Sequence, residues 1–253
     1  LNSNFSLATA VFRDINKAIK IIPGGSQTFS KGPSQFTNNF APKYLKKGKG
    51  CNVWDVDNNK FIDYVMACQP LILGYSDPDI NRAVSKQLKI GSTFSLMNRL
   101  EIEVAELLVK HIPSAEMVRF GKNGGDATTI AIKIARAVTG RQKVAFCGYH
   151  GWHDWYLSAN LTNNDNLENH LLPGLSSNGV PKELEGTIYP FNYNDLDYLK
   201  KIIQEKKIGV IKMEVIRNVE PKNNFLQKVR TLASKKNIIL IFDECSSGFR
   251  ETN

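Results

Sequence analysis

The 253-residue chain lacks several features that would assign it to a specialised class. No stretch approaches the roughly 18 uninterrupted apolar residues of a membrane-spanning helix. The N-terminus, LNSNFSLATAVFRDINKAIK, has no basic segment followed by an apolar core, so we expect no secretory signal peptide in this stretch. There is no internal repeat and no low-complexity segment. The sequence therefore predicts a cytoplasmic globular protein with one large domain, or one domain and part of another.

Cysteine is scarce, and charge is not concentrated in one place. The four cysteines are Cys51, Cys68, Cys147 and Cys245, with no CxxC pair and no histidines at zinc-finger spacing. We expect reduced thiols and no metal site. The net charge is +9, but the basic residues are scattered rather than clustered with aromatics. Solvated lysine-rich faces are the favoured interpretation, and nucleic-acid binding is not expected.

Strand and helix patterns alternate through the second half of the chain. Such alternation predicts an α/β fold with a mainly parallel sheet. The expected strands are residues 117–120, 143–147, 187–189, 209–215 and 238–242, and the expected helices are 126–139, 195–206 and 224–236. Residues 160–186 show no periodicity and predict a long loop. Before these, we expect helices over 5–22, 78–88 and 98–112 and a β-hairpin over 51–66.

The most informative stretch is IILIFDECSSGFR, residues 238–250. Its apolar run predicts a strand buried on both faces in a parallel sheet. Asp243 and Glu244 follow at the carboxyl end, where ligands bind in open α/β sheets. A carboxylate there could meet a cationic group of a ligand. The alternative is that Asp243 caps the next turn and Glu244 is solvated.

Two further motifs stand at expected strand ends. Gly124 and Gly125 lie between a strand and a helix, where backbone N–H groups and the helix N-terminus can bind phosphate. Neither GxGxxG nor Walker spacing is present, which disfavours a nucleotide loop. Tyr149 could stack on a planar heterocycle, and His150 could serve as an acid, a base or a hydrogen-bond donor. Alternatively, the glycines only shape a turn, Tyr149 packs in the core and His150 bonds backbone.

The three motifs together favour one kind of ligand. A planar ring with a phosphate and a basic nitrogen would use a phosphate-binding turn, an aromatic side chain and a strand-end aspartate. Pyridoxal 5′-phosphate (PLP) is such a molecule. An aspartate beside its pyridine nitrogen keeps that nitrogen protonated, so that the ring withdraws electrons from the reacting carbon.

The chain resembles the class III (subgroup II) PLP-dependent aminotransferases, closest to their glutamate-1-semialdehyde 2,1-aminomutase-like branch. The resemblance covers nearly the whole chain and is carried by WDVDNNKFIDY, FGKNGGDATTIAIKIARAVTGR, CGYHGWHDW and IILIFDECSSGFR. It implies the type I aminotransferase fold, with helices on both faces of the large-domain sheet, and a homodimer with active sites at the interface. It also implies amino transfer between a small-molecule amino donor and a carbonyl acceptor, or within one substrate. A decarboxylase or racemase of the same fold, and a non-catalytic binding protein, are the alternatives.

The resemblance also implies roles for individual residues. The cofactor would be held by the phosphate-binding glycines, the stacking tyrosine with its neighbouring histidine, the aspartate on the pyridine nitrogen, and a small side chain against the ring: Gly124, Gly125, Tyr149, His150, Asp243 and Cys245. Asp243 would be the catalytic residue among them. Gly125 replaces a usual serine or threonine.

Substrate contacts are expected from Ser26 and Glu214. Ser26 lies in a loop rich in hydroxyls and amides, and Glu214 matches a strand-end glutamate that the family follows with proline. Here Val215 follows instead. The loop after Pro23 also departs from the aminomutase pattern, so glutamate semialdehyde is not assigned as the substrate.

One expected residue is absent. The family attaches PLP to a lysine that follows the Asp-Glu motif by a few tens of residues, whereas this chain ends at Asn253. We therefore expect a C-terminally incomplete part of a longer protein, inactive alone, with apolar surface left bare. Residues 1–75 would form an N-terminal segment belonging to the small domain, and residues 76–253 an incomplete PLP-binding large domain.

Overall fold

A computed structural model describes residues 9–35, 41–163, 166–168, 170, 176–216 and 218–250. The chain divides into two compact units, Leu1–Asn98 and Arg99–Asn253. Residues 5–8 of the helix expected at 5–22 lie outside the described residues. Within the described part of the chain, no helix has the length and apolarity needed to cross a membrane.

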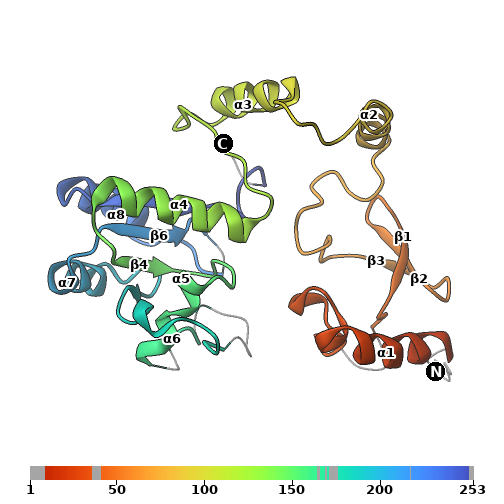
Figure 1. The fold of residues 1–253 in the computed structure, drawn as a ribbon, viewed down its shortest axis with the longest axis horizontal. Helices are drawn as coiled ribbons and strands as arrows, with labels where there is room; N and C mark the ends of the chain where they lie inside the picture. Colours follow the sequence, from red (N-terminus) through yellow and green to blue (C-terminus); the bar gives the residue numbers. More distant parts are fainter. Residues whose placement is uncertain are drawn as a thin grey trace. The chain divides into compact units, whose positions relative to one another are not determined.

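The first unit combines short helices with a small antiparallel sheet of order β1-β2-β3 (Figure 1). Asp55 shapes its hairpin turn, since its side chain accepts hydrogen bonds from the backbone N–H groups of Asp57 and Asn59. The expected hairpin is confirmed, whereas the strand that precedes it was not expected. The elements are α1 (Thr9–Ile21), two 3₁₀ turns (Pro23–Gly25 and Phe29–Lys31), β1 (Leu45–Lys49), β2 (Asn52–Asp55), β3 (Lys60–Ile62) and α2 (Pro78–Leu88).

The second unit is an α/β layer structure. Its four strands are all parallel, in the order β5-β4-β6-β7, so the predicted fold class is confirmed. The elements are α3 (Arg99–His111), α4 (Gly124–Thr139), β4 (Val144–Cys147), α5 (Asp154–Leu157), α6 (Ala159–Thr162), a 3₁₀ turn (Lys182–Leu184), β5 (Ile188–Pro190), α7 (Leu196–Lys206), β6 (Val210–Glu214), α8 (Phe225–Lys235) and β7 (Ile239–Asp243).

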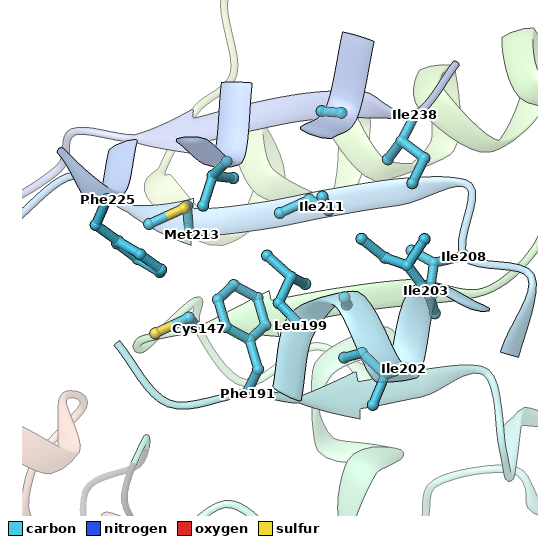
Figure 2. Close-up of a cluster of buried hydrophobic side chains, with 13 residues drawn as sticks. Cys147, Phe191, Leu199, Ile202, Ile203, Ile208, Ile211, Met213, Phe225 and Ile238 are labelled. Atoms are coloured by element: carbon cyan, nitrogen blue, oxygen red, sulfur yellow. The ribbon is translucent and has the colours of Figure 1, made fainter. Parts of the chain in front are cut away.

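Apolar clusters cover both faces of this sheet. Alternate residues of β4 and β6 point to opposite faces, as the two-residue period of a strand requires. One cluster joins Ile211 and Met213 to the inward faces of α7 and α8 (Figure 2). The other joins Val144, Phe146 and Val210 to α4 and the α5–α6 segment. The sheet is thus fixed between two apolar layers, which holds its strand ends in place.

Three sequence predictions are wrong in detail. Residues 117–120 form no strand, and Met117 is 91% exposed, because no described strand pairs with this stretch. The β7 strand is not buried on both faces: it pairs with β6 at the sheet edge, and Phe242 is 38% exposed. The expected loop at 160–186 also contains part of α6 and the 3₁₀ turn at Lys182–Leu184.

Candidate functional site

The N-terminus of α4 forms one side of the site. Asn123 caps the helix, and its Oδ1 accepts a hydrogen bond from the Asp126 N–H at 2.9 Å. The first N–H groups of a helix have no acceptor inside the helix. Among the residues that the structure describes, neither the Gly124 N–H nor the Gly125 N–H donates a hydrogen bond. These two amides remain available to an anion.

Asp243, the last residue of β7, is the centre of the polar groups at the sheet edge. Its Oδ2 lies 2.9 Å from His150 Nδ1 and 2.8 Å from Lys212 Nζ. Its Oδ1 accepts a hydrogen bond from the Cys245 N–H at 3.1 Å. We call Lys212, His150, Asp243 and the Cys245 amide the Asp243 cluster. Residues far apart in the sequence meet here because parallel strands end at the same edge.

The Asp243 cluster keeps a carboxylate ionised although it is buried. Burial by itself would raise the pKa of Asp243, but the hydrogen bond with His150 and the charge of Lys212 outweigh burial and hold that pKa well below its usual value. Burial lowers the pKa of His150, and Lys212 lowers it further, against the opposing effect of Asp243. His150 is therefore neutral at pH 7, and Lys212 is the cation of the cluster.

Gly148 and its neighbours form another part of the site. Gly148 has φ +106°, and a Cβ there would stand 2.3 Å from Glu214 Oε2. The same glutamate oxygen accepts a hydrogen bond from the Tyr149 N–H at 3.1 Å. On the other side, the Gly148 N–H donates to His170 Nδ1 at 3.2 Å. Only glycine fits this backbone position, so Gly148, the residue before Tyr149, allows Glu214 to lie against the end of β4.

The Tyr149 ring is half-buried. It meets Tyr156 edge-on, with ring centroids 6.2 Å apart, and packs against the apolar cluster on the α4 face. A cavity of about 140 Å³ lies nearby, lined by Cys147, Gly148 and His170 among others, and Glu214 also faces it. The alternative prediction, that Tyr149 packs in the core, thus holds for part of its ring.

Gly125 and Cys245 also lie beside the α4 N-terminus. A Cβ on Gly124 would be 3.5 Å from Cys245 Sγ, which puts that thiol next to the helix start. Burial, reinforced by the Asp243 charge, raises the pKa of Cys245 to about 11, so it is a neutral thiol. A Cβ on Gly125 would stand only 2.8 Å from His153 Nε2. The imidazole of His153 thus occupies the space that a serine or threonine would need here.

Ser26 belongs to the first unit. Its hydroxyl donates to the Thr28 carbonyl at 3.0 Å. Ser26 also lines a cavity of about 590 Å³ within that unit, together with Ile15, Tyr44 and Tyr75. Of the predicted site residues, the structure therefore brings together those of the second unit.

The groups at the sheet edge fit the chemistry of PLP. A phosphate matches the two free amides at the start of α4, and a pyridinium nitrogen matches a carboxylate that stays ionised when buried. The polar groups stand at the carboxyl ends of β4, β6 and β7, where ligands bind in open α/β sheets.

Comparison with known proteins assigns the chain to a family. The family model described as aminotransferase class-III matches residues 36–252. The chain belongs to the class-III aminotransferases. Over 243 residues it is 40% identical to the glutamate-1-semialdehyde 2,1-aminomutase of Methanobrevibacter smithii, covering 91% of this chain and 54% of that protein. It is 38% identical, over 92% of its length and 54% of the relative, to the 3-aminobutyryl-CoA aminotransferase of Cloacimonas acidaminovorans.

Structural comparison agrees with the α/β fold. The FumI protein of Sphingopyxis sp. MTA144, solved with PLP, matches with a TM-score of 0.83 and 25% identity, over 96% of this chain and 56% of FumI. The predicted family and α/β fold are confirmed. The chain spans about half the length of the curated relatives that it matches.

Two polar residues near the site were not predicted from the sequence. Lys212 was not among the predicted site residues, yet its Nζ contacts Asp243. Lys212 stands between apolar residues of a central strand, where an unpaired charge would be costly. This sequence pattern could have indicated a buried partner for the lysine. His170, which accepts from the Gly148 N–H, lies in a stretch without periodicity and gave no such signal.

Proposed function

We propose that the full-length protein containing this chain is a PLP-dependent aminotransferase or aminomutase, moving an amino group to or within a small carbonyl substrate. The observation that carries the proposal is the ionised, buried carboxylate of Asp243 at the sheet edge that the α4 N-terminus also borders. Family membership supports it independently. Bound PLP supplies an electron-withdrawing ring that stabilises negative charge on the carbon bearing the amino group.

Each residue of the site has a proposed part. The Gly124 and Gly125 amides bind the phosphate, with the partial positive charge of the α4 N-terminus adding to the attraction. Asp243 holds a proton on the ring nitrogen, and the ring of Tyr149 packs against the cofactor. His150 fixes the Asp243 carboxylate at 2.9 Å. Cys245 would lie against the ring as a small neutral group.

Other parts of the proposal concern the substrate and the assembly. Glu214, 7% exposed beside a cavity, and Ser26 in the first unit are proposed to contact substrate. The named relatives include an aminotransferase and an aminomutase at nearly equal identity, so similarity does not choose between the two reactions. We propose a homodimer, as the family resemblance implies, and a cytoplasmic location, in keeping with four free cysteines.

Substitution of Asp243 tests the function. In the full-length protein, Asp243→Asn removes the charge that retains the ring-nitrogen proton and keeps the shape of the side chain. Loss of one such electrostatic contribution commonly costs about 10²–10³ in rate. We expect single-turnover conversion with an amino donor to slow by that factor, while the dissociation constant of PLP rises less, since the phosphate contacts persist.

Asp197→Asn is the matched control, because Asp197 is an exposed residue of α7 that pairs with Lys200. It should leave rate and affinity unchanged. An Asp243→Asn protein with wild-type single-turnover rates would remove Asp243 from the mechanism. A wild-type protein that takes up no PLP would overturn the proposed function as a whole.

A further inference from the structure

Lys212 is an unusual residue for its position. It is the middle residue of β6, a strand whose five residues are all buried, and it is itself 2% exposed. Its neighbours on the strand, Ile211 and Met213, belong to the apolar cluster on the opposite face. A charge so placed is costly unless it is paired. The partner is Asp243, with Lys212 Nζ 2.8 Å from Oδ2.

The pairing competes with the proposed task of Asp243. The carboxylate carries one negative charge, and three groups at the site can share it: Lys212, a protonated His150, and the protonated ring nitrogen of PLP. Both ring nitrogens of His150 lie near acceptors, with Nδ1 2.9 Å from Asp243 Oδ2 and Nε2 3.1 Å from the Cys147 carbonyl oxygen.

We propose that Lys212 is a positioning residue that weakens the hold of Asp243 on the ring-nitrogen proton of PLP. This inference rests on the proposed function. Lys212 and His150 both lie at Oδ2 of Asp243, whereas Oδ1 accepts a hydrogen bond from the Cys245 N–H. Its positive charge, in direct contact with Asp243, also repels a second positive charge on the cofactor ring. A nearby like charge commonly lowers the pKa of such a cation by one unit or more.

The consequence is a cofactor less strongly activated than its aspartate alone would make it. A ring nitrogen that keeps its proton less firmly withdraws fewer electrons from the reacting carbon. Lys212 also satisfies Asp243 before the cofactor arrives, which avoids an unpaired buried carboxylate. Lys212 thus sets the strength of the contact that Asp243 makes, and need not touch the substrate.

The test compares two ligands of the full-length protein. One is PLP, and the other is its carba analogue, in which CH replaces the ring nitrogen so that no proton can bind there. The ratio of their dissociation constants, analogue over PLP, measures how strongly the site favours a protonated ring nitrogen. In Lys212→Met we expect this ratio to rise about 10-fold or more, which is one pKa unit. Lys212→Gln keeps a hydrogen-bond donor of similar length and should raise it as well, which covers failure of the methionine variant to fold.

A double-variant cycle separates this role from a merely structural one. In the Asp243→Asn background, Lys212→Gln should change the ratio clearly less than it does beside Asp243, because no carboxylate remains to be shared and only the direct repulsion between the two positive charges is left. Lys143→Met is the control. Lys143 is another lysine of the second unit, and its ammonium group lies over the Tyr189 ring, so this substitution should leave the ratio unchanged. An unchanged ratio in both Lys212 variants, or an equal change with and without Asp243, overturns the inference. Absence of PLP binding by the wild type overturns instead the proposed function.

Discussion

At the scale of single residues, the site depends on close approaches that only particular side chains allow. Lys212 and Asp243 illustrate this for charge, and Gly148 does so for volume. Gly148 combines a positive φ with a neighbour, Glu214, whose carboxylate lies where a Cβ would be. The conformation and the contact are separate demands, and each excludes residues other than glycine.

Substitution of glycine by alanine at two positions separates these demands. Gly140 also has a positive φ, +64°, but no atom lies within 4 Å of its missing Cβ. Gly140→Ala should therefore lose only the conformational term, about 1 kcal/mol of unfolding free energy. Gly148→Ala adds the clash with Glu214 and should lose at least about twice as much. Urea denaturation of the full-length variants measures both values, and equal losses would show that Glu214 moves aside freely.

At the scale of elements, the start of α4 is specified locally. Asn123 is the residue before the helix, and its Oδ1 accepts the Asp126 N–H at 2.9 Å. Asn123→Ala leaves this N–H without a partner and should lower the unfolding free energy by about 1 kcal/mol. Asn123→Asp retains the acceptor and should lose much less. Denaturation curves of the two variants provide the measurement, and equal destabilisation would mean that the cap contributes nothing.

Local signals of this kind were readable in the sequence, whereas pairing between distant segments was not. Asp77 and Asn123 cap α2 and α4 at the boundaries that their side chains suggest. Residues 117–120 have strand-like composition but no described strand beside them, so they form none. The contact of Lys212 with Asp243 arises because β6 and β7 are adjacent, with Glu214 opposite Asp243. Strand order fixes this contact, and strand order is not visible in residue spacing.

The buried face of α4 shows the same limit. Apolar residues lie on more than one side of this helix, so composition does not determine which of them turn inward. The structure buries Thr128, Ile132 and Ala135, while Ile134 and Val138 are exposed. Helical periodicity correctly predicted the helix but left the rotation about its axis undetermined.

At the scale of the whole chain, much apolar side-chain surface is exposed. Neither α2 nor α3 has a buried residue. On α3 the apolar residues Leu100, Val104 and Leu107 are exposed, as are Leu96 and Met97 before the helix. Soluble monomers rarely expose contiguous apolar patches of more than a few hundred Å². The bare apolar surface expected from the sequence is thus seen in these elements.

Stability should fall in mild acid because two histidines are buried in their neutral form. Burial lowers the pKa of His170 to about 4, and the pKa of His150 is lowered as well. In the unfolded chain both return to about 6.5, so below that pH the unfolded state binds more protons than the folded state. The sign is therefore a loss of stability as the pH falls, and for His170 it amounts to about 1.4 kcal/mol per pH unit. For His170 this loss ends near pH 4.

The variant that tests this pH dependence is His170→Asn, made in the full-length protein. Asparagine offers an oxygen in place of Nδ1 to accept the Gly148 N–H, but it does not titrate. The urea concentration at the unfolding midpoint, measured at pH 7.5, 6 and 5, should fall less steeply with decreasing pH in the variant than in the wild type. The reason is that one buried histidine fewer titrates. His111→Asn at the exposed end of α3 is the control and should keep the wild-type slope. Identical slopes for wild type and His170→Asn would mean that His170 binds its proton equally well in both states. Its bond with Gly148 would then not require the neutral ring.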